Sequence, residues 1–107
     1  MSYPRVFCDI ETTSLSKKCD IVQIAAVSNS DKFSEYILPS QTIAPSASAV
    51  TGLQMQGHSL YYNGNPVHAV PIREALILFL AWLSERKPCV LIGHNFQQFD
   101  FPRIIRA

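Results

Sequence analysis

The chain has 107 residues, of which 48% are hydrophobic and only 16% are charged, with nine Lys and Arg against eight Asp and Glu. This apolar composition excludes an intrinsically disordered chain and predicts a single domain with a buried core. A net charge of +1 excludes the broad basic surface that drives non-specific nucleic-acid binding, so any nucleic acid must be held at a local site.

No apolar run approaches the roughly 20 residues of a membrane span, and the N-terminus lacks the hydrophobic core of a signal peptide. Three cysteines without C-x-x-C spacing argue against a disulfide framework and against a structural zinc site. We therefore expect an intracellular protein, of the nucleus or cytoplasm and without a membrane partner. Cys8 and Cys89 are interpreted as small buried hydrophobes.

Three strands and a short helix are predicted in the first half of the chain. Residues 5–10 are apolar and rich in strand formers, and residues 20–27 are apolar on both faces, as in a central strand. Turn-forming residues 28–31 connect the second strand to residues 33–38, so these two strands should form an antiparallel hairpin. Residues 45–52 are expected to form a helix that ends at Gly52.

The second half is predicted to cross over the sheet. Residues 54–70 are interpreted as a loop, and residues 71–86 as a helix that is apolar on almost every side. Residues 89–92 should form a buried strand parallel to the first one. A last helix is expected to begin at Asp100, with Pro102 in its first turn. The order of these elements indicates an α/β domain.

Three carboxylates are expected at one edge of this sheet. Asp9 and Glu11 are two residues apart on a strand, so their side chains share a face, and Asp100 follows the parallel strand that ends near Gly93. Functional groups gather beyond the carboxyl ends of parallel strands. Two structural alternatives remain: Asp9 and Glu11 could mark a solvated strand end, and Asp100 could be an ordinary helix cap.

Two segments resemble motifs of the DEDD-type 3′-to-5′ exonucleases. Residues 6–15, V-F-C-D-I-E-T-T-S-L, are similar to the first motif, D-x-E-T-T-G-L, and residues 91–100, L-I-G-H-N-F-Q-Q-F-D, to the second, H-N-x-x-x-F-D. Between them, S-A-S-A-V-T-G-L resembles the family's small helix. The segment D-I-V-Q-I-A-A-V, followed by K-F and I-L-P, is also similar to the exonuclease-like extensions of promyelocytic leukaemia proteins.

The resemblance implies a ribonuclease H-like mixed sheet with flanking helices and a metal-dependent hydrolysis of phosphodiester bonds at DNA or RNA 3′ ends. Two Mg²⁺ or Mn²⁺ ions would activate a water and stabilise the leaving oxygen. By motif, Asp9 would bridge both ions, Glu11 would hold the ion on the nucleophile side and Asp100 would hold the other.

The same motifs assign three residues to the substrate. The backbone near Thr12 would meet the terminal 3′-hydroxyl, Leu15 would wedge against the last base and Asn95 would support the site. His94 is interpreted as structural, because the family's general base belongs to a third motif. Ser14 departs from the family pattern, which has Gly at that position.

The third motif, which supplies the base and a fourth carboxylate, has no counterpart in residues 1–107. We therefore interpret the chain as the N-terminal part of a single exonuclease domain, truncated after the fourth strand, and expect little activity from it alone. The alternative is a non-catalytic exonuclease-like module that binds nucleic acid or protein. Self-association is expected through an exposed edge strand and through the apolar helix, at Ile77, Leu78 and Trp82.

Overall fold

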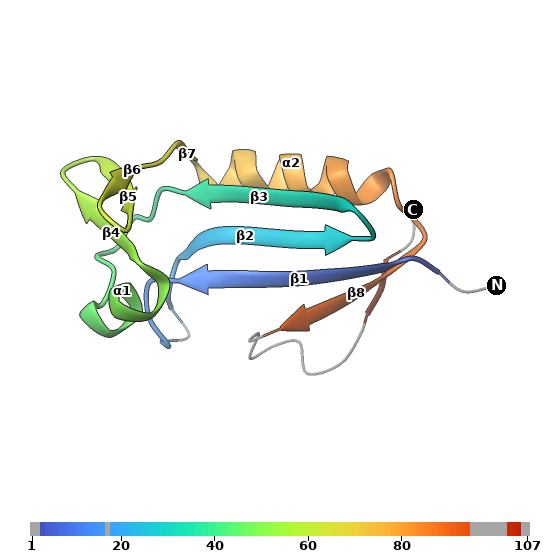
Figure 1. Ribbon diagram of the computed structural model, residues 1–107, viewed down its shortest axis with the longest axis horizontal. Coiled ribbons are helices and arrows are strands. Elements are labelled where there is room, and N and C mark those ends of the chain that lie inside the picture. Colours follow the sequence, from blue (N-terminus) through green and yellow to red (C-terminus); the bar gives the residue numbers. More distant parts are fainter. Residues whose placement is uncertain (1–2, 17, 95–102, 106–107) are drawn as a thin grey trace.

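The computed structural model describes residues 3–16, 18–94 and 103–105, which form a mixed α/β fold. Its main sheet has six strands in the order β7-β3-β2-β1-β8-β9 (Figure 1). The strands of this sheet are β1 (Arg5–Thr12), β2 (Ile21–Ser28), β3 (Asp31–Ile37), β7 (Ala69–Val70), β8 (Cys89–His94) and β9 (Arg103–Ile105). Two helices, α1 (Pro45–Thr51) and α2 (Ile72–Ser84), complete this framework in the described residues.

The first three strands form an antiparallel meander, and the predicted hairpin is confirmed. Ser28 pairs with Asp31 across a two-residue turn, and Asn29 in that turn has a φ of 56°. Asparagine tolerates this left-handed conformation because its short side chain bonds locally, and two-residue turns with positive φ match the twist of paired strands. The hairpin thereby fixes the register in which Ala25 opposes Ser34.

The predicted parallel pairing of the first strand with the last buried strand is also confirmed. Phe7 pairs with Ile92 and Asp9 with His94, and α2 lies in the connection between β3 and β8. Parallel neighbours need such a crossover because a tight turn can join only antiparallel strands. The carboxyl ends of β1 and β8 therefore point to the same end of the sheet, as their arrowheads show in Figure 1.

One face of the sheet carries the main hydrophobic core. Along β1, Val6 and Cys8 are buried, and the same alternation buries every second residue of β2. From α2, Ala75 and Leu83 complete the cluster, with Phe79 and Trp82 partly buried against it. Because side chains alternate between faces, Phe7, Asp9 and Glu11 lie on the opposite face of the sheet.

The segment 54–70, interpreted from the sequence as a loop, instead contains most of a second small sheet and strand β7 of the main sheet, and the loop prediction is wrong. Strands β4 (Leu53–Gln56), β5 (Ser59–Tyr62) and β6 (Asn65–Pro66) form it. Asn63 and Gly64 both have positive φ and make the tight turn for which an Asn-Gly pair is the strongest sequence signal. Leu53 and Leu60 are fully buried in a second core cluster.

The final helix expected from Asp100 is also corrected. Residues 103–105 form β9, which pairs antiparallel with β8, while Asp100 itself lies outside the described residues. A helix of so few residues is unstable alone, whereas Ile104 and Ile105 are β-branched and the neighbouring edge of β8 offers hydrogen-bond partners. The edge of β8 is consequently covered rather than exposed.

The expectation that α2 exposes Ile77, Leu78 and Trp82 is only partly correct. Ile77 and Leu78 are exposed, at 61% and 40%, but Trp82 is partly buried. Its ring lies 5.9 Å from that of Phe33 and 6.3 Å from that of Phe79, measured between centroids. Aromatic contacts of this kind add to the free energy gained by burying the rings, so Trp82 packs against the core as a partly buried side chain.

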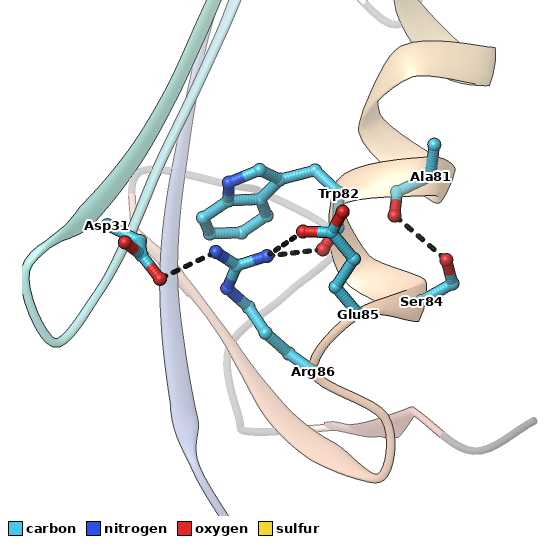
Figure 2. Close-up of polar contacts among 6 residues, drawn as sticks. All are labelled: Asp31, Ala81, Trp82, Ser84, Glu85 and Arg86. Atoms are coloured by element: carbon cyan, nitrogen blue, oxygen red, sulfur yellow. Dashed lines mark hydrogen bonds and ion pairs between the residues drawn. The ribbon is translucent and has the colours of Figure 1, made fainter.

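Arg86 stacks on the Trp82 ring of this aromatic cluster (Figure 2). Its guanidinium carbon lies 3.7 Å from the centre of the Trp82 ring, and its Nη2 donates to Asp31 Oδ2 at 2.8 Å. Its Nη1 donates to the Trp82 carbonyl. The planar guanidinium can stack and donate in several directions at once, so Arg86 ties the end of α2 to the β2–β3 turn.

We expect Arg86→Ala to lower the free energy of unfolding by about 2 kcal/mol, since it removes a stacked cation and its charge-assisted hydrogen bonds. The free energy of unfolding of Arg86→Lys should lie between those of Arg86→Ala and the original protein, because lysine keeps the charge but lacks the planar guanidinium. Urea denaturation measures both. Arg5→Ala, at an exposed arginine, is the control, and an equal loss in that variant would contradict the assigned role.

Candidate functional site

Asp9 and Glu11 lie near the carboxyl end of β1, on the face of the sheet opposite α2. Both side chains are half-buried. Asp9 is flanked by Ala25 of β2 and His94 of β8, and Glu11 by Gln23 of β2. Asp9 therefore has a paired strand on each side, which fixes the position of its backbone. The location of Asp9 and Glu11 on one face agrees with their two-residue spacing in the sequence.

The electrostatics of this pair are unfavourable in the protein alone. Burial, and secondly the negative charge of Asp9, raise the pKa of the Glu11 carboxyl. Asp9 Oδ1 is buried, and no hydrogen-bond donor reaches it within the part of the chain that is described. A buried acceptor without a donor carries a desolvation penalty of about 1–3 kcal/mol. A cation between the two carboxylates would relieve both effects.

Cys8 lies on the other face of β1 and does not contribute a reactive group. Burial, and secondly the charge of Asp9, raise the pKa of its thiol to about 11. Burial also raises the pKa of Cys89. A thiol with a raised pKa is a poor nucleophile and a poor metal ligand, because both roles need the thiolate. The interpretation of Cys8 and Cys89 as buried residues is confirmed.

The loop after β1 is fixed from inside by Thr13, which sequence reasoning missed. Thr13 is fully buried: its amide donates to the Asp20 carbonyl at 2.9 Å, and its carbonyl accepts from the Ala44 amide at 2.8 Å. The adjacent Thr12 hydroxyl donates to the Ser14 carbonyl. Leu15, four residues beyond Glu11, is 87% exposed, so the loop holds an apolar side chain out in solvent.

Asp20 holds this loop against the chain that follows β3. Its carboxylate accepts the amide and hydroxyl of Ser40, at 2.6 and 2.7 Å, and the amide and side chain of Gln41, at 3.2 and 3.0 Å. The side-chain hydrogen bond from Ser40 is the largest of several that lower the pKa of Asp20. Nothing in the sequence singled out this pair of loops as contacting each other.

The structure brings together Asp9 and Glu11, with Thr12 and Leu15 directly after them. Asn95 and Asp100 lie outside the described residues, so their predicted places beside this pair stay predictions. Among residues 3–16, 18–94 and 103–105, no group of three or more His, Cys, Asp or Glu side chains could hold a metal ion. The described part of the candidate site therefore consists of one carboxylate pair and the loop that follows it.

A shallow groove adjoins Asp9 on the open face of the sheet. It runs between β1 and β3, and Phe7, Ala25, Val27 and Lys32 line it together with Asp9. Phe7 is 49% exposed, which is unusual for an aromatic residue on a central strand. The alternation of β1 signals this feature, because it puts Phe7 on the same face as Asp9, but the sequence analysis did not single it out.

No protein-family model matches the chain, and no curated protein matches it. None of the helices in the described residues is long and apolar enough to cross a membrane.

The Asp20 contacts predict a pH-dependent contribution to stability. Because its folded-state pKa is lowered, Asp20 stabilises the fold above the unfolded-state pKa of about 4, and this contribution is lost as the pH falls through the folded-state value. We expect Asp20→Asn to unfold at lower urea concentration at pH 7, and the difference from the original protein to shrink below about pH 4. A difference in urea midpoint between the two proteins that stays constant from pH 7 to below pH 4 would contradict this stabilising role of Asp20.

Proposed function

We propose that this chain carries the metal-binding and 3′-end-binding part of a DEDD-type 3′-to-5′ exonuclease, an intracellular enzyme acting on DNA or RNA. The observation that carries this proposal is the pair Asp9 and Glu11, which share one face at the end of a central strand. The motif resemblance of residues 6–15 and 91–100 supports the same reading.

The residues of the pair fit a divalent cation. Carboxylate oxygens are the ligands that Mg²⁺ and Mn²⁺ prefer, and Asp9 Oδ1 is a buried acceptor without a donor among the described residues. No ion pair within that part of the chain neutralises either carboxylate. When bound, two such ions supply the activated water and the stabilisation of the leaving oxygen. Asp100 is proposed as the third ligand.

The protein's own residues would position the nucleic-acid end. The Thr12 hydroxyl donates a hydrogen bond to the Ser14 carbonyl, so the backbone near Thr12, and not this hydroxyl, would contact the terminal 3′-hydroxyl. The exposed side chain of Leu15 would contact the last base. Asn95 is proposed to support the site. The backbone hydrogen bonds of buried Thr13 fix this loop in place. A fixed loop favours hydrolysis, because the terminal nucleotide must be held within a fraction of an ångström of its reactive position.

The first test of this proposal is metal binding. Mg²⁺ or Mn²⁺ should raise the melting temperature by mass action, and Asp9→Asn should abolish the shift. Without metal, Glu11→Gln should raise the melting temperature at pH 7. The reason is that a raised folded-state pKa means that ionised Glu11 destabilises the fold as the pH rises above the unfolded-state pKa.

Glu74→Gln is the matched control for these carboxylate variants, because Glu74 is an exposed acidic residue on α2. It should keep the full metal shift. A shift of equal size in Asp9→Asn would refute metal binding at the pair, and a lower melting temperature of metal-free Glu11→Gln would refute the electrostatic argument.

The second test separates the exonuclease from a non-catalytic binding module. In Ca²⁺, which suppresses turnover, a labelled oligonucleotide with a free 3′-hydroxyl should bind more tightly than the same oligonucleotide with a 3′-phosphate. Its affinity should depend only weakly on salt, because few phosphates are contacted. Leu15→Ser should reduce this preference. Equal binding of both ends, unchanged in Asp9→Asn, would instead favour the binding module.

A further inference from the structure

The open face of the main sheet carries an aromatic side chain beside the carboxylate pair. Phe7 lies two residues before Asp9 on β1, so the two side chains share a face and their Cα atoms are about 7 Å apart. Phe7 is 49% exposed, although β1 is a central strand that lies between β2 and β8 (Figure 1). Its ring is therefore accessible to any ligand that reaches the carboxylates.

The residues beside Phe7 form the floor of the shallow groove. Phe7 pairs with Val27 of β2, and Val27 pairs with Lys32 of β3, so these three side chains form one row across the open face. Asp9 and Ala25 belong to the next row. The groove has a volume of about 330 Å³, at the lower end of the range of about 300–1,000 Å³ for small-molecule sites. Its size suits a single flat group.

The charges on this face change sign along β1. Asp9 and Glu11 lie toward its carboxyl end, whereas Arg5 is exposed on the same face beyond Phe7, at the amino end. Lys32 is exposed level with Phe7, across β2. Within the described ranges, neither Arg5 nor Lys32 takes part in an ion pair. A complementary ligand has a metal-binding end, a flat apolar group in the middle and a further negative charge beyond it.

We propose that this groove binds the single strand that leads to the 3′ end. The base of the penultimate nucleotide stacks on Phe7, Lys32 contacts the phosphate on its 5′ side, and the strand continues toward Arg5. Aromatic side chains on an open sheet face are stacking platforms for unpaired bases, and lysine is a common phosphate ligand. This inference rests on the proposed function, because it extends the strand away from the same carboxylate site.

This arrangement selects unpaired 3′ ends over duplex ends. The bases of a duplex are stacked on their neighbours and paired, so stacking on Phe7 would first require unpairing of the end, at a cost in free energy. An unpaired base is already free to stack. The sequence of the strand should matter little, because every base has a π-face. The expected substrate class is therefore a single-stranded 3′ end of any sequence.

Binding of a labelled single-stranded oligonucleotide, in Ca²⁺ to suppress turnover, tests the stacking. Phe7→Leu keeps an apolar side chain but removes the aromatic ring, and should weaken binding by roughly tenfold. Phe7→Trp should retain the affinity. Neither variant should change the weaker binding of a G·C-rich blunt duplex that ends in the same nucleotides. Ile77→Ala is the matched control, because Ile77 is an exposed apolar residue on α2, and it should bind like the unmodified chain.

Two further measurements locate the strand on the groove. A 2-aminopurine at the penultimate position should lose emission when it stacks on the unmodified chain, and should lose less on Phe7→Leu at saturating protein. Lys32→Gln should weaken binding and reduce the slope of log Kobs against log salt by about 0.7, the value for one phosphate contact of a single strand. Arg73→Gln, at an exposed arginine on α2, is the matched control and should leave the slope unchanged.

Unchanged single-strand binding of Phe7→Leu, tighter binding of the duplex, or an unchanged salt slope of Lys32→Gln would overturn the proposal. The metal-induced melting shift separates this failure from failure of the proposed function, because neither Phe7 nor Lys32 holds the ion and both variants should keep the shift. If the shift persists while Phe7→Leu binds normally, only the groove proposal fails. If the unmodified chain shows neither the shift nor single-strand binding, the proposed function fails with it.

Discussion

The side chains of β1 alternate between the buried core and the open face of the sheet. This alternation determines both the stability of the fold and the position of the candidate site. Val6 and Cys8 face α2 and are buried, whereas Phe7, Asp9 and Glu11 face the open side. A shift of one residue in the pairing would bury both carboxylates in the core and expose the apolar residues. The antiparallel pairing with β2 and the parallel pairing with β8 both depend on this register, so the core and the candidate site are specified together.

The strands and helices that carry strong periodic signals could be predicted from the sequence. Apolar runs rich in strand formers located β1 and β2, the turn residues after β2 located the β2–β3 hairpin, and the apolar spacing after Pro71 located α2. The small sheet formed by β4, β5 and β6 was missed because its strands have only two to four residues each. The Asn63-Gly64 turn carried the required signal, but periodicity over four residues is too short to confirm it.

The candidate site could be predicted only as far as single-strand geometry reaches. The two-residue spacing of Asp9 and Glu11 is sufficient to place them on one face. The roles of Thr13 and Asp20 depend on contacts between loops that are distant in the sequence, such as the hydrogen bonds from Ser40 to Asp20. No local pattern encodes such contacts. Similarly, the partial burial of Trp82 depends on Phe33 and Arg86, which belong to other elements.

The distribution of the cysteines gives this protein a built-in position for a spectroscopic label. Cys8 and Cys89 are enclosed in the core, while Cys19 is only partly covered and directly precedes Asp20. A thiol-reactive fluorophore should therefore modify one residue selectively, in the loop that connects β1 to β2. Its emission would report on the order of that loop, without any substitution in the protein.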